Sequence, residues 1–213
     1  MQRGNVTVDF RCYLITDRRQ TGGRPLIAVL QAAAQAGIKA VQLREKDMTP
    51  RELFALAVEA QNALTPYGTR LLVNDRADIA RAAQLSGVHL TGSSLSPAAA
   101  RCCLSTGSLV GVSTHTLAEA QFAEQFGADF ITFGPVYPTA SKAAYGAPRG
   151  VSALAEVCAE VRIPVFALGG VTPVRIPPCL DAGAHGIAAI SALLDVPDIA
   201  SAVEEFAKAL RGL

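Results

Sequence analysis

The sequence predicts a (β/α)8 TIM barrel that forms a single domain over residues 1–213. Two observations predict this fold: eight short β-branched runs recur along the chain, and alanine-rich stretches of helical character separate them. No Gly-x-Gly-x-x-Gly sequence follows the first run, which disfavours the main alternative, a doubly wound open sheet. A chain of 213 residues that is 50% hydrophobic can bury the core of one such barrel.

The predicted strands share a short apolar core and end in polar or small residues. In chain order they cover residues 12–16, 40–45, 70–74, 87–90, 109–113, 130–134, 164–169 and 186–191. Helices are expected between them, including residues 25–36, 50–64 and 117–126, with a closing helix over about 199–210. A hydroxyl residue followed by proline marks three helix starts, at Thr49-Pro50, Ser96-Pro97 and Thr172-Pro173.

The second predicted strand carries two cations at alternate positions. Gln42, Arg44 and Lys46 share one face because side chains alternate along a strand. Since the working residues of a TIM barrel lie at the C-terminal ends of its strands, this pattern predicts an anion site. The alternative is that Arg44 and Lys46 pair with Glu45 and Asp47 as solvated surface charge.

Polar residues follow the other predicted strands at the same end of the barrel. They are Thr16, Asp17, Asn74, Asp75, Ser113, His115, Thr139, Ser141 and Lys142. Gly169-Gly170 follows the seventh strand, and a short helical segment begins at Ile190-Ser191 after the eighth. This is where barrels commonly bind phosphate, although a tight turn is the alternative reading of two glycines.

Composition limits the partners and the location of the protein. The net charge of +1 and the lack of a basic tail disfavour binding to nucleic acid or to an acidic membrane surface. The polar N-terminus lacks the apolar segment of a signal peptide, and no run is long enough to span a bilayer, so we expect a cytoplasmic protein. Five cysteines without Cys-x-x-Cys spacing predict reduced, buried thiols.

Six segments resemble the thiamine phosphate synthase family, which includes the TenI-type thiazole tautomerases. They are YLITD (residues 13–17), VQLREKD (41–47), VNDRAD (73–78), GVSTHT (111–116), FGPVYPT (133–139) and FALGGV (166–171). The resemblance covers essentially the whole chain in the expected order. It implies an enzyme that joins hydroxymethylpyrimidine diphosphate to hydroxyethylthiazole phosphate with Mg²⁺ and releases pyrophosphate.

The resemblance also implies roles for individual residues. Contacts to the diphosphate and the pyrimidine are implied for Gln42, Arg44, Lys46, Asn74, Ser113 and Lys142, and a magnesium ligand for Asp75. Contacts to the thiazole phosphate are implied for Thr139, Ser141, Gly170, Ile190 and Ser191. Of these, Arg44, Lys46 and Lys142 are expected to stabilise the charge that develops on the leaving diphosphate. A homodimer is possible.

One segment departs from the synthase pattern. Thr91-Gly92-Ser93-Ser94 stands where synthases usually carry an acidic pair, so Ser94 cannot supply the second metal carboxylate. This segment resembles the TenI-type proteins, in which a histidine matching His115 acts as acid and base. The tautomerase is therefore the alternative function, and a non-catalytic barrel that binds a thiazole phosphate is a lesser one. His89 is expected to be a hydrogen-bonded core residue.

Overall fold

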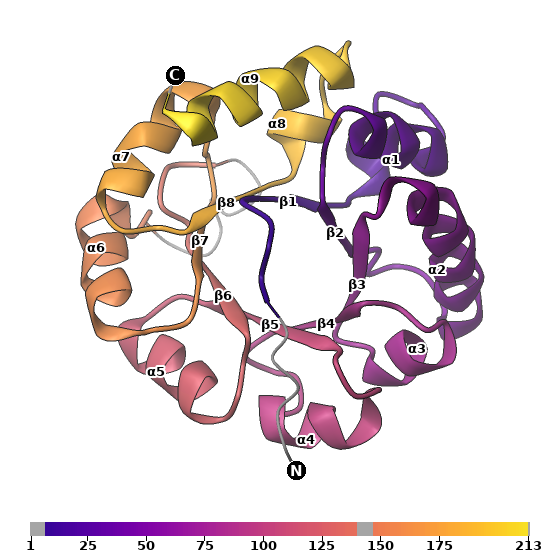
Figure 1. Ribbon diagram of the computed structural model, residues 1–213, viewed down its shortest axis with the longest axis horizontal. Helices are drawn as coiled ribbons and strands as arrows, with labels where there is room; N and C mark the ends of the chain where they lie inside the picture. The colour runs from indigo at the N-terminus through magenta and orange to yellow at the C-terminus, as the bar shows by residue number, and fades with distance from the viewer. Residues whose placement is uncertain (1–6, 140–146, 213) are drawn as a thin grey trace.

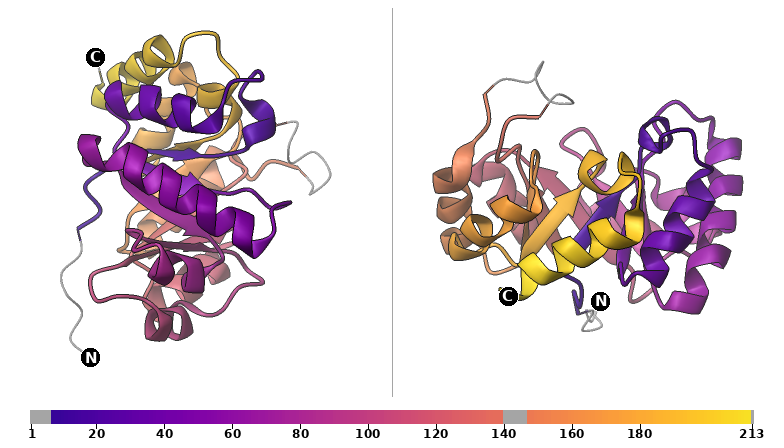
Figure 2. Two further views of the ribbon diagram at one scale, coloured as in Figure 1. Left: turned by 90° about the vertical axis from the view of Figure 1, so that its right-hand side faces the viewer. Right: turned by 90° about the horizontal axis from the view of Figure 1, so that it is seen from above.

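The computed structural model describes residues 7–139 and 147–212 of the chain. Eight parallel strands pair in sequence order from β1 to β8, and β8 pairs with β1, which closes the barrel. The helices form a ring around the strands, as all three ribbon views show (Figures 1 and 2). The predicted (β/α)8 TIM barrel is therefore confirmed.

The eight strands lie close to their predicted positions. They are β1 (Cys12–Ile15), β2 (Ala40–Leu43), β3 (Arg70–Asn74), β4 (Gly87–Leu90), β5 (Leu109–Thr114), β6 (Phe130–Phe133), β7 (Val165–Leu168) and β8 (Gly186–Ala189). Strand β2 stops two residues before its predicted end because Glu45 turns toward β1, where it accepts a hydrogen bond from Thr16. Strand β8 stops before Ile190, which is the N-cap residue of the next helix.

Helices connect successive strands on the outside of the barrel. They are α1 (Leu26–Gln35), α2 (Pro50–Leu64), α3 (Ala77–Ala82), α4 (Pro97–Cys103), α5 (Leu117–Gln125), α6 (Gly150–Glu160), α7 (Ile176–Asp181), α8 (Ser191–Leu194) and α9 (Ile199–Arg211). The short 3₁₀ helices are η1 (Arg18–Gln20), η2 (Thr65–Tyr67) and η4 (Pro173–Arg175). Helix α9 packs between α1 and α7 and covers the closing side of the barrel (Figure 1).

Two of the three predicted helix caps are confirmed. Thr49 and Glu52 form a reciprocal capping box at the start of α2, and the Ser96 side chain accepts from Ala99 N at the start of α4. The third prediction is wrong in detail. Thr172 precedes only the 3₁₀ helix η4 and makes no capping bond with its side chain.

Aromatic rings fill the lower part of the barrel interior. Phe10 lies just before β1 and stacks on Phe166, with ring centroids 5.2 Å apart, while Phe130 meets Phe10 edge-on at 5.6 Å. All three are at most 2% exposed. This apolar plug closes the interior at the N-terminal ends of the strands, so a ligand site is left to the opposite mouth.

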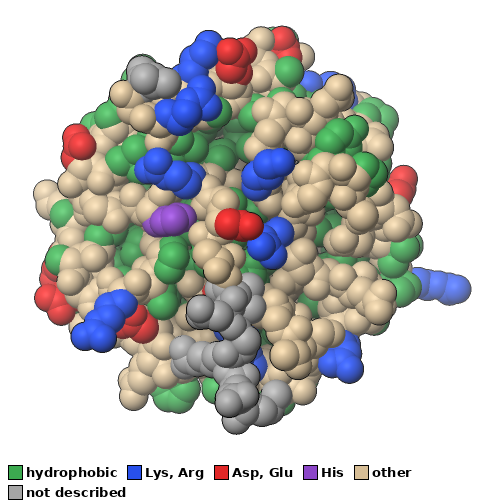
Figure 3. All heavy atoms as spheres, viewed as in Figure 1, with side chains coloured by type: hydrophobic (Ala, Val, Ile, Leu, Met, Phe, Trp, Pro, Cys, Tyr) green, Lys and Arg blue, Asp and Glu red, His purple; other side chains and the backbone are tan. Residues whose placement is uncertain are grey.

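The surface charges, the helix lengths and the cysteines can be compared with the expectations from composition. Acidic and basic side chains are interspersed on the face seen in Figure 3. No helix among residues 7–139 and 147–212 is long and apolar enough to cross a membrane. All five cysteines are free, as expected, and Cys179 is buried. The expectation of burial is wrong for Cys102 and Cys103, which are exposed because they end the short helix α4.

Candidate active site

Gln42 places an unused hydrogen-bond donor inside the barrel. Ala40, two residues earlier on β2, belongs to the interior cluster, so the alternation of the strand turns Gln42 inward as well. Gln42 is only 2% exposed, and its Nε2 atom makes no hydrogen bond of good geometry among the residues that the structure describes. Its side chain does lie close to the Tyr13 hydroxyl, where it opposes the rise that burial causes in the pKa of Tyr13. Because a buried donor without a partner is costly, this atom marks a place where a ligand would be favourable.

The acidic neighbours of the β2 cations are bound by a different residue. Arg18 donates to Glu45 from its backbone N at 3.1 Å and from Nη1 at 3.1 Å, and its guanidinium also binds both carboxylate oxygens of Asp47. These bonds raise the pKa of Arg18. Glu45 and Asp47 thus pair with Arg18, and the alternative in which they pair with Arg44 and Lys46 is wrong.

Arg44, Lys46 and Asp75 form one electrostatic group at the ends of β2 and β3. The charge of Arg44, assisted by partial burial, lowers the pKa of Lys46, and the carboxylate of Asp75 opposes this shift. Asp75 has a φ of +65°, a left-handed conformation that few residues other than glycine adopt, and its backbone N donates to the carbonyl of His89 at 2.9 Å. Strained backbone of this kind is concentrated at functional sites.

Ser113 lies within hydrogen-bonding distance of a buried histidine. His89 on β4 is fully buried, and its Nε2 atom lies 3.0 Å from Ser113 Oγ, while the Tyr13 hydroxyl lies 3.5 Å from its Nδ1 atom. Burial and, to a lesser degree, the charge of Arg44 lower the pKa of His89 to about 3. The ring is therefore neutral at physiological pH, and the predicted core role of His89 is confirmed.

His115 has a defined tautomer. Its Nδ1 atom lies 2.5 Å from the carbonyl oxygen of Gly134, and a carbonyl can only accept, so Nδ1 carries the proton. In the neutral ring Nε2 is then an acceptor. The backbone N of His115 donates to Glu119 Oε2 at 2.6 Å, which fixes the start of the following helix. His115 also lines a cavity that forms a second part of the barrel mouth, apart from the ends of β2 and β3.

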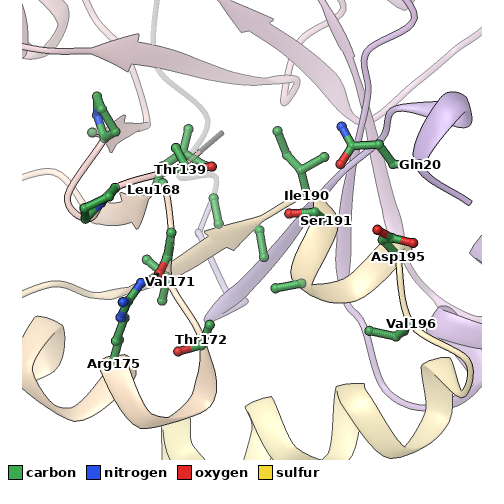
Figure 4. A pocket seen from close by; sticks show the side chains of 18 of the residues that line it. Gln20, Thr139, Leu168, Val171, Thr172, Arg175, Ile190, Ser191, Asp195 and Val196 are labelled. Carbon is green, nitrogen blue, oxygen red and sulfur yellow. Dashed lines mark hydrogen bonds between the residues drawn. The ribbon is translucent and has the colours of Figure 1, made fainter. Parts of the chain in front are cut away.

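This second part is a cavity of about 430 Å³ at the ends of β6, β7 and β8. Thr172 and Arg175 lie on one side of it, and Ser191 and Asp195 on the other (Figure 4). Gly169 and Gly170 line it with φ angles of +97° and +62°. The glycines are required by close packing as well, since a Cβ at Gly170 would lie 2.5 Å from the carbonyl oxygen of Pro138.

The structure groups the residues predicted for the site into two neighbouring sets. At the ends of β2 to β5 lie Gln42, Arg44, Lys46, Asn74, Asp75 and Ser113. Around the cavity lie His115, Thr139, Gly170, Ile190 and Ser191. Ser141 and Lys142 lie outside the described residues.

A sequence model of the family described as thiamine monophosphate synthase matches residues 12–193. The chain belongs to this family. It is 53% identical over 191 residues, 90% of each chain, to a Geobacter sulfurreducens protein described provisionally as a thiamine-phosphate synthase. It is 40% identical over 200 residues to the thiamine-phosphate synthase of Methanospirillum hungatei, covering 94% of this chain and 97% of that one.

A solved structure agrees with the sequence relatives. Thiamine phosphate pyrophosphorylase from Pyrococcus furiosus superposes with a TM-score of 0.86 at 30% identity, over 95% of this chain and 96% of that one. The match extends over nearly the full length of both proteins. The barrel and its connecting helices are thus those of the thiamine monophosphate synthase family.

The chain departs from the expected metal site of the family at Ser94. Its Oγ accepts from the backbone N of Thr91 at 2.8 Å and lies 3.0 Å from Thr91 Oγ1, so this hydroxyl closes its own loop. Among the described residues, no group of three or more His, Cys, Asp or Glu side chains could hold a metal ion. Magnesium, however, is commonly bound by one or two carboxylates together with substrate phosphates. Asp75 fits that mode of binding.

Three residues that sequence reasoning overlooked shape the site. Arg18 binds Glu45 and Asp47, and Arg175 and Tyr137 hold the loop after β7. Arg18 lies three residues after the end of β1, and nearness to a strand end is a signal that sequence reasoning can use. Tyr137 lies within the FGPVYPT segment, but nothing local assigns it a role. Arg175 gave no signal, because Thr172-Pro173 just before it indicates only a helix start.

Proposed function

We propose that this chain is a thiamine-phosphate synthase that joins hydroxymethylpyrimidine diphosphate to hydroxyethylthiazole phosphate and releases pyrophosphate. The observation that carries the proposal is that a cationic group at the end of β2 lies at the same mouth of the barrel as a separate cavity with a glycine pair. One mouth thus offers places for two phosphorylated substrates. The names of the relatives from Methanospirillum hungatei and Pyrococcus furiosus support the same activity.

Arg44 and Lys46, the cations at the end of β2, suit the negative charge that develops during the reaction. As the bond between the pyrimidine methylene and the diphosphate breaks, negative charge accumulates on the leaving oxygens. Arg44 and Lys46 are charges fixed in place before the reaction, so they stabilise this state more than the ground state. The thiazole nitrogen then forms the new bond to the methylene carbon. The free donor of Gln42 would hold the pyrimidine during this step.

The cavity at β6 to β8 suits the thiazole phosphate. Thr139, Gly170, Ile190 and Ser191 line it, and the backbone amides of the last three would donate to phosphate oxygens. Ser141 and Lys142 are expected to complete the two half-sites, although they lie outside the described residues. Holding both substrates at one mouth replaces a bimolecular encounter with an oriented reaction.

Asp75 would hold Mg²⁺ jointly with the diphosphate oxygens. When bound, the ion would neutralise charge on the leaving group. The protein would contribute the single carboxylate, and the neighbouring Lys46 and Arg44 would contribute the remaining positive charge. Ser94 is not assigned to the metal because its hydroxyl closes the loop at Thr91.

Product formation tests the proposal. The purified protein is given hydroxymethylpyrimidine diphosphate, hydroxyethylthiazole phosphate and Mg²⁺, and thiamine phosphate and pyrophosphate are quantified. We expect equal amounts of both products and no turnover in the presence of EDTA. Tight binding of the thiazole phosphate with no product would refute the synthase and favour a ligand-binding regulator.

A thiazole tautomerase is the second candidate, and one observation favours it. The hydrogen bond from His115 Nδ1 to Gly134 leaves Nε2 able to take and return a proton. In a tautomerase, His115→Gln would abolish isomerisation of the thiazole carboxylate phosphate. In a synthase, the same variant would leave coupling to the pyrimidine largely intact, because that reaction needs charge stabilisation in place of a base.

The biological context follows from the proposed activity. We infer that the partners are small phosphorylated pyrimidine and thiazole molecules and that the protein acts in the cytoplasm. The possible homodimer stays a prediction, which sedimentation equilibrium tests directly. A species of about 22.2 kDa at all concentrations would contradict it.

A further inference from the structure

Arg175 links the two loops that border the cavity. It ends η4, lines the cavity, and donates from Nη1 to the carbonyl oxygen of Gly170 at 2.6 Å. The centre of its guanidinium lies 4.8 Å from the ring centroid of Tyr137, which belongs to the loop after β6. A planar guanidinium can stack on an aromatic ring and donate in its own plane at the same time.

The glycine pair is held on both of its peptide planes. The carbonyl of Gly169 accepts from the backbone N of Tyr137 at 3.0 Å, and the carbonyl of Gly170 accepts from Arg175. In a trans peptide the N–H points opposite to the carbonyl. The N–H of Gly170 is therefore directed away from the β6 loop, and the N–H of Val171 is directed away from Arg175.

Glycines at positive φ are the most easily displaced residues of such a loop. Gly169 and Gly170 both lie in the left-handed region, and neither has a side chain to hold its peptide plane. The hydrogen bond from Arg175 is assisted by charge, which makes it roughly twice as strong as a neutral one. It is thus the contact best able to fix the peptide plane between Gly170 and Val171.

Arg175 also sets the charge of the cavity. Among the described residues that line it, Arg175 is the one lysine or arginine, and Asp195 on the opposite side is the one carboxylate (Figure 4). One of its guanidinium hydrogens is committed to Gly170, and the guanidinium carries five in all. A dianionic phosphate bound in this cavity would therefore share it with a permanent positive charge.

We propose that Arg175 is a positioning and specificity-determining residue for the phosphate of the thiazole substrate. It holds the peptide plane between Gly170 and Val171, and with it the Val171 amide, in the orientation that accepts a phosphate, and its charge favours the phosphate ester over the uncharged alcohol. The identity of the ligand rests on the proposed function. We call the contacts of Arg175 with Gly170 and Tyr137 the clamp. By itself, the clamp predicts only that the cavity prefers a phosphorylated ligand.

Arg175→Met and Arg175→Lys test this role, with Arg162→Met as the matched control. Methionine keeps an apolar stem over Tyr137 without donors or charge, and lysine keeps the charge without the planar fork. Arg162 is exposed and lies between α6 and β7, at the other end of the barrel. Isothermal titration calorimetry measures the binding of hydroxyethylthiazole phosphate, hydroxyethylthiazole and inorganic phosphate to each protein.

We expect Arg175→Met to weaken binding of the phosphate ester and of inorganic phosphate by about tenfold or more, and binding of the alcohol by less than about twofold. Arg175→Lys should lie between this variant and the wild type, and Arg162→Met should match the wild type. Equal losses for ester and alcohol would show a purely structural role and overturn the proposal, as would unchanged binding. A wild-type protein that does not prefer the ester would overturn it too.

The coupling assay separates this proposal from the proposed function. A protein that forms no thiamine phosphate but loses preference for the ester in Arg175→Met would keep the clamp and refute the synthase. A synthase whose KM for the thiazole phosphate is the same in Arg175→Met as in the wild type would refute the clamp alone.

Discussion

Lys46 titrates under the influence of its neighbours. The charge of Arg44 and partial burial lower its pKa, so it loses its proton at a lower pH than an ordinary lysine. If the charged form is needed, kcat/KM for the diphosphate substrate falls as the pH rises through this lowered pKa. We predict that a pH–rate profile shows this alkaline limb in the wild type and that Lys46→Arg moves it upward. An identical limb in both proteins would contradict the assignment.

His89 makes the stability of the barrel depend on pH. Its folded pKa of about 3 lies below its ordinary value of 6.5, so between these values the unfolded chain binds a proton that the folded chain excludes. The free energy of unfolding therefore falls as the pH drops below 6.5, by up to about 1.4 kcal/mol per pH unit. Urea unfolding at pH 7.5 and 5.5 measures the change.

His89→Gln removes this contribution. Between pH 7.5 and pH 5.5, the free energy of unfolding of the variant is expected to fall by about 1 kcal/mol less than that of the wild type. Carboxylates titrate mainly at lower pH and contribute little to this difference. His185, whose pKa is also lowered by burial, is common to both proteins and cancels in the comparison. Equal losses would mean that His89 accepts a proton in the folded state.

Asp75 and Ser94 make metal binding depend on the substrate. With one available carboxylate beside Lys46, free Mg²⁺ should bind weakly, and pyrophosphate should strengthen its binding by supplying further oxygens. Calorimetric titration of Mg²⁺ with and without pyrophosphate tests this prediction. Ser94→Asp should bind free Mg²⁺ more tightly than the wild type. Tight binding to the wild type without pyrophosphate would contradict the argument.

Sequence patterns predicted the residues of the β2 end and not their partners. Strand alternation was sufficient to place Gln42 inside the barrel. The pairing of Arg18 with Glu45 crosses 27 residues of chain, and local charge patterns favoured nearer partners for this acid. Only the closure of β1 against β2 brings the two together.

The glycine loop after β7 is the element most sensitive to a single methyl group. We predict that Gly170→Ala weakens binding of hydroxyethylthiazole phosphate by about tenfold, because the added Cβ would meet the Pro138 carbonyl at 2.5 Å and displace the loop. Gly107→Ala is the control. It has a φ of +86° but no atom within 4 Å of the added Cβ.

Both alanine variants should lose about 1 kcal/mol of stability from the left-handed backbone, and Gly170→Ala more because of the contact. Calorimetry for binding and urea unfolding for stability separate the two effects. Equal phosphate affinity in the two variants would show that the loop does not position the ligand.

Element boundaries were predictable where a local signal controlled them. The capping box at Thr49 fixed the start of α2, because both of its members lie within four residues. Five of the eight strand ends were predicted one or two residues too long, because residues such as Glu45 and Ile190 leave the sheet for contacts that depend on the fold. Thr172-Pro173 shows the limit of the same signal, since only a 3₁₀ turn follows it.

At the scale of the whole molecule, the repeated strand and helix pattern was sufficient for the barrel. That pattern also assigned every polar strand end to one mouth, as the positions of Gln42, Ser113 and His115 bear out. Both anion sites of this mouth were predicted, but the packing that shapes the second was not. The loops after β6 and β7 meet through Tyr137 and Arg175, which are far apart in the sequence.

Arg44 and Lys46 at the end of β2 are proposed to stabilise the leaving diphosphate. The most direct test measures thiamine phosphate formation by Arg44→Gln and Lys46→Gln, with Arg162→Gln as the control. We predict that each β2 variant loses about 100-fold or more in kcat/KM for the pyrimidine diphosphate, whereas binding of the thiazole phosphate is unchanged. Activity within about twofold of the control in both variants would contradict the claim.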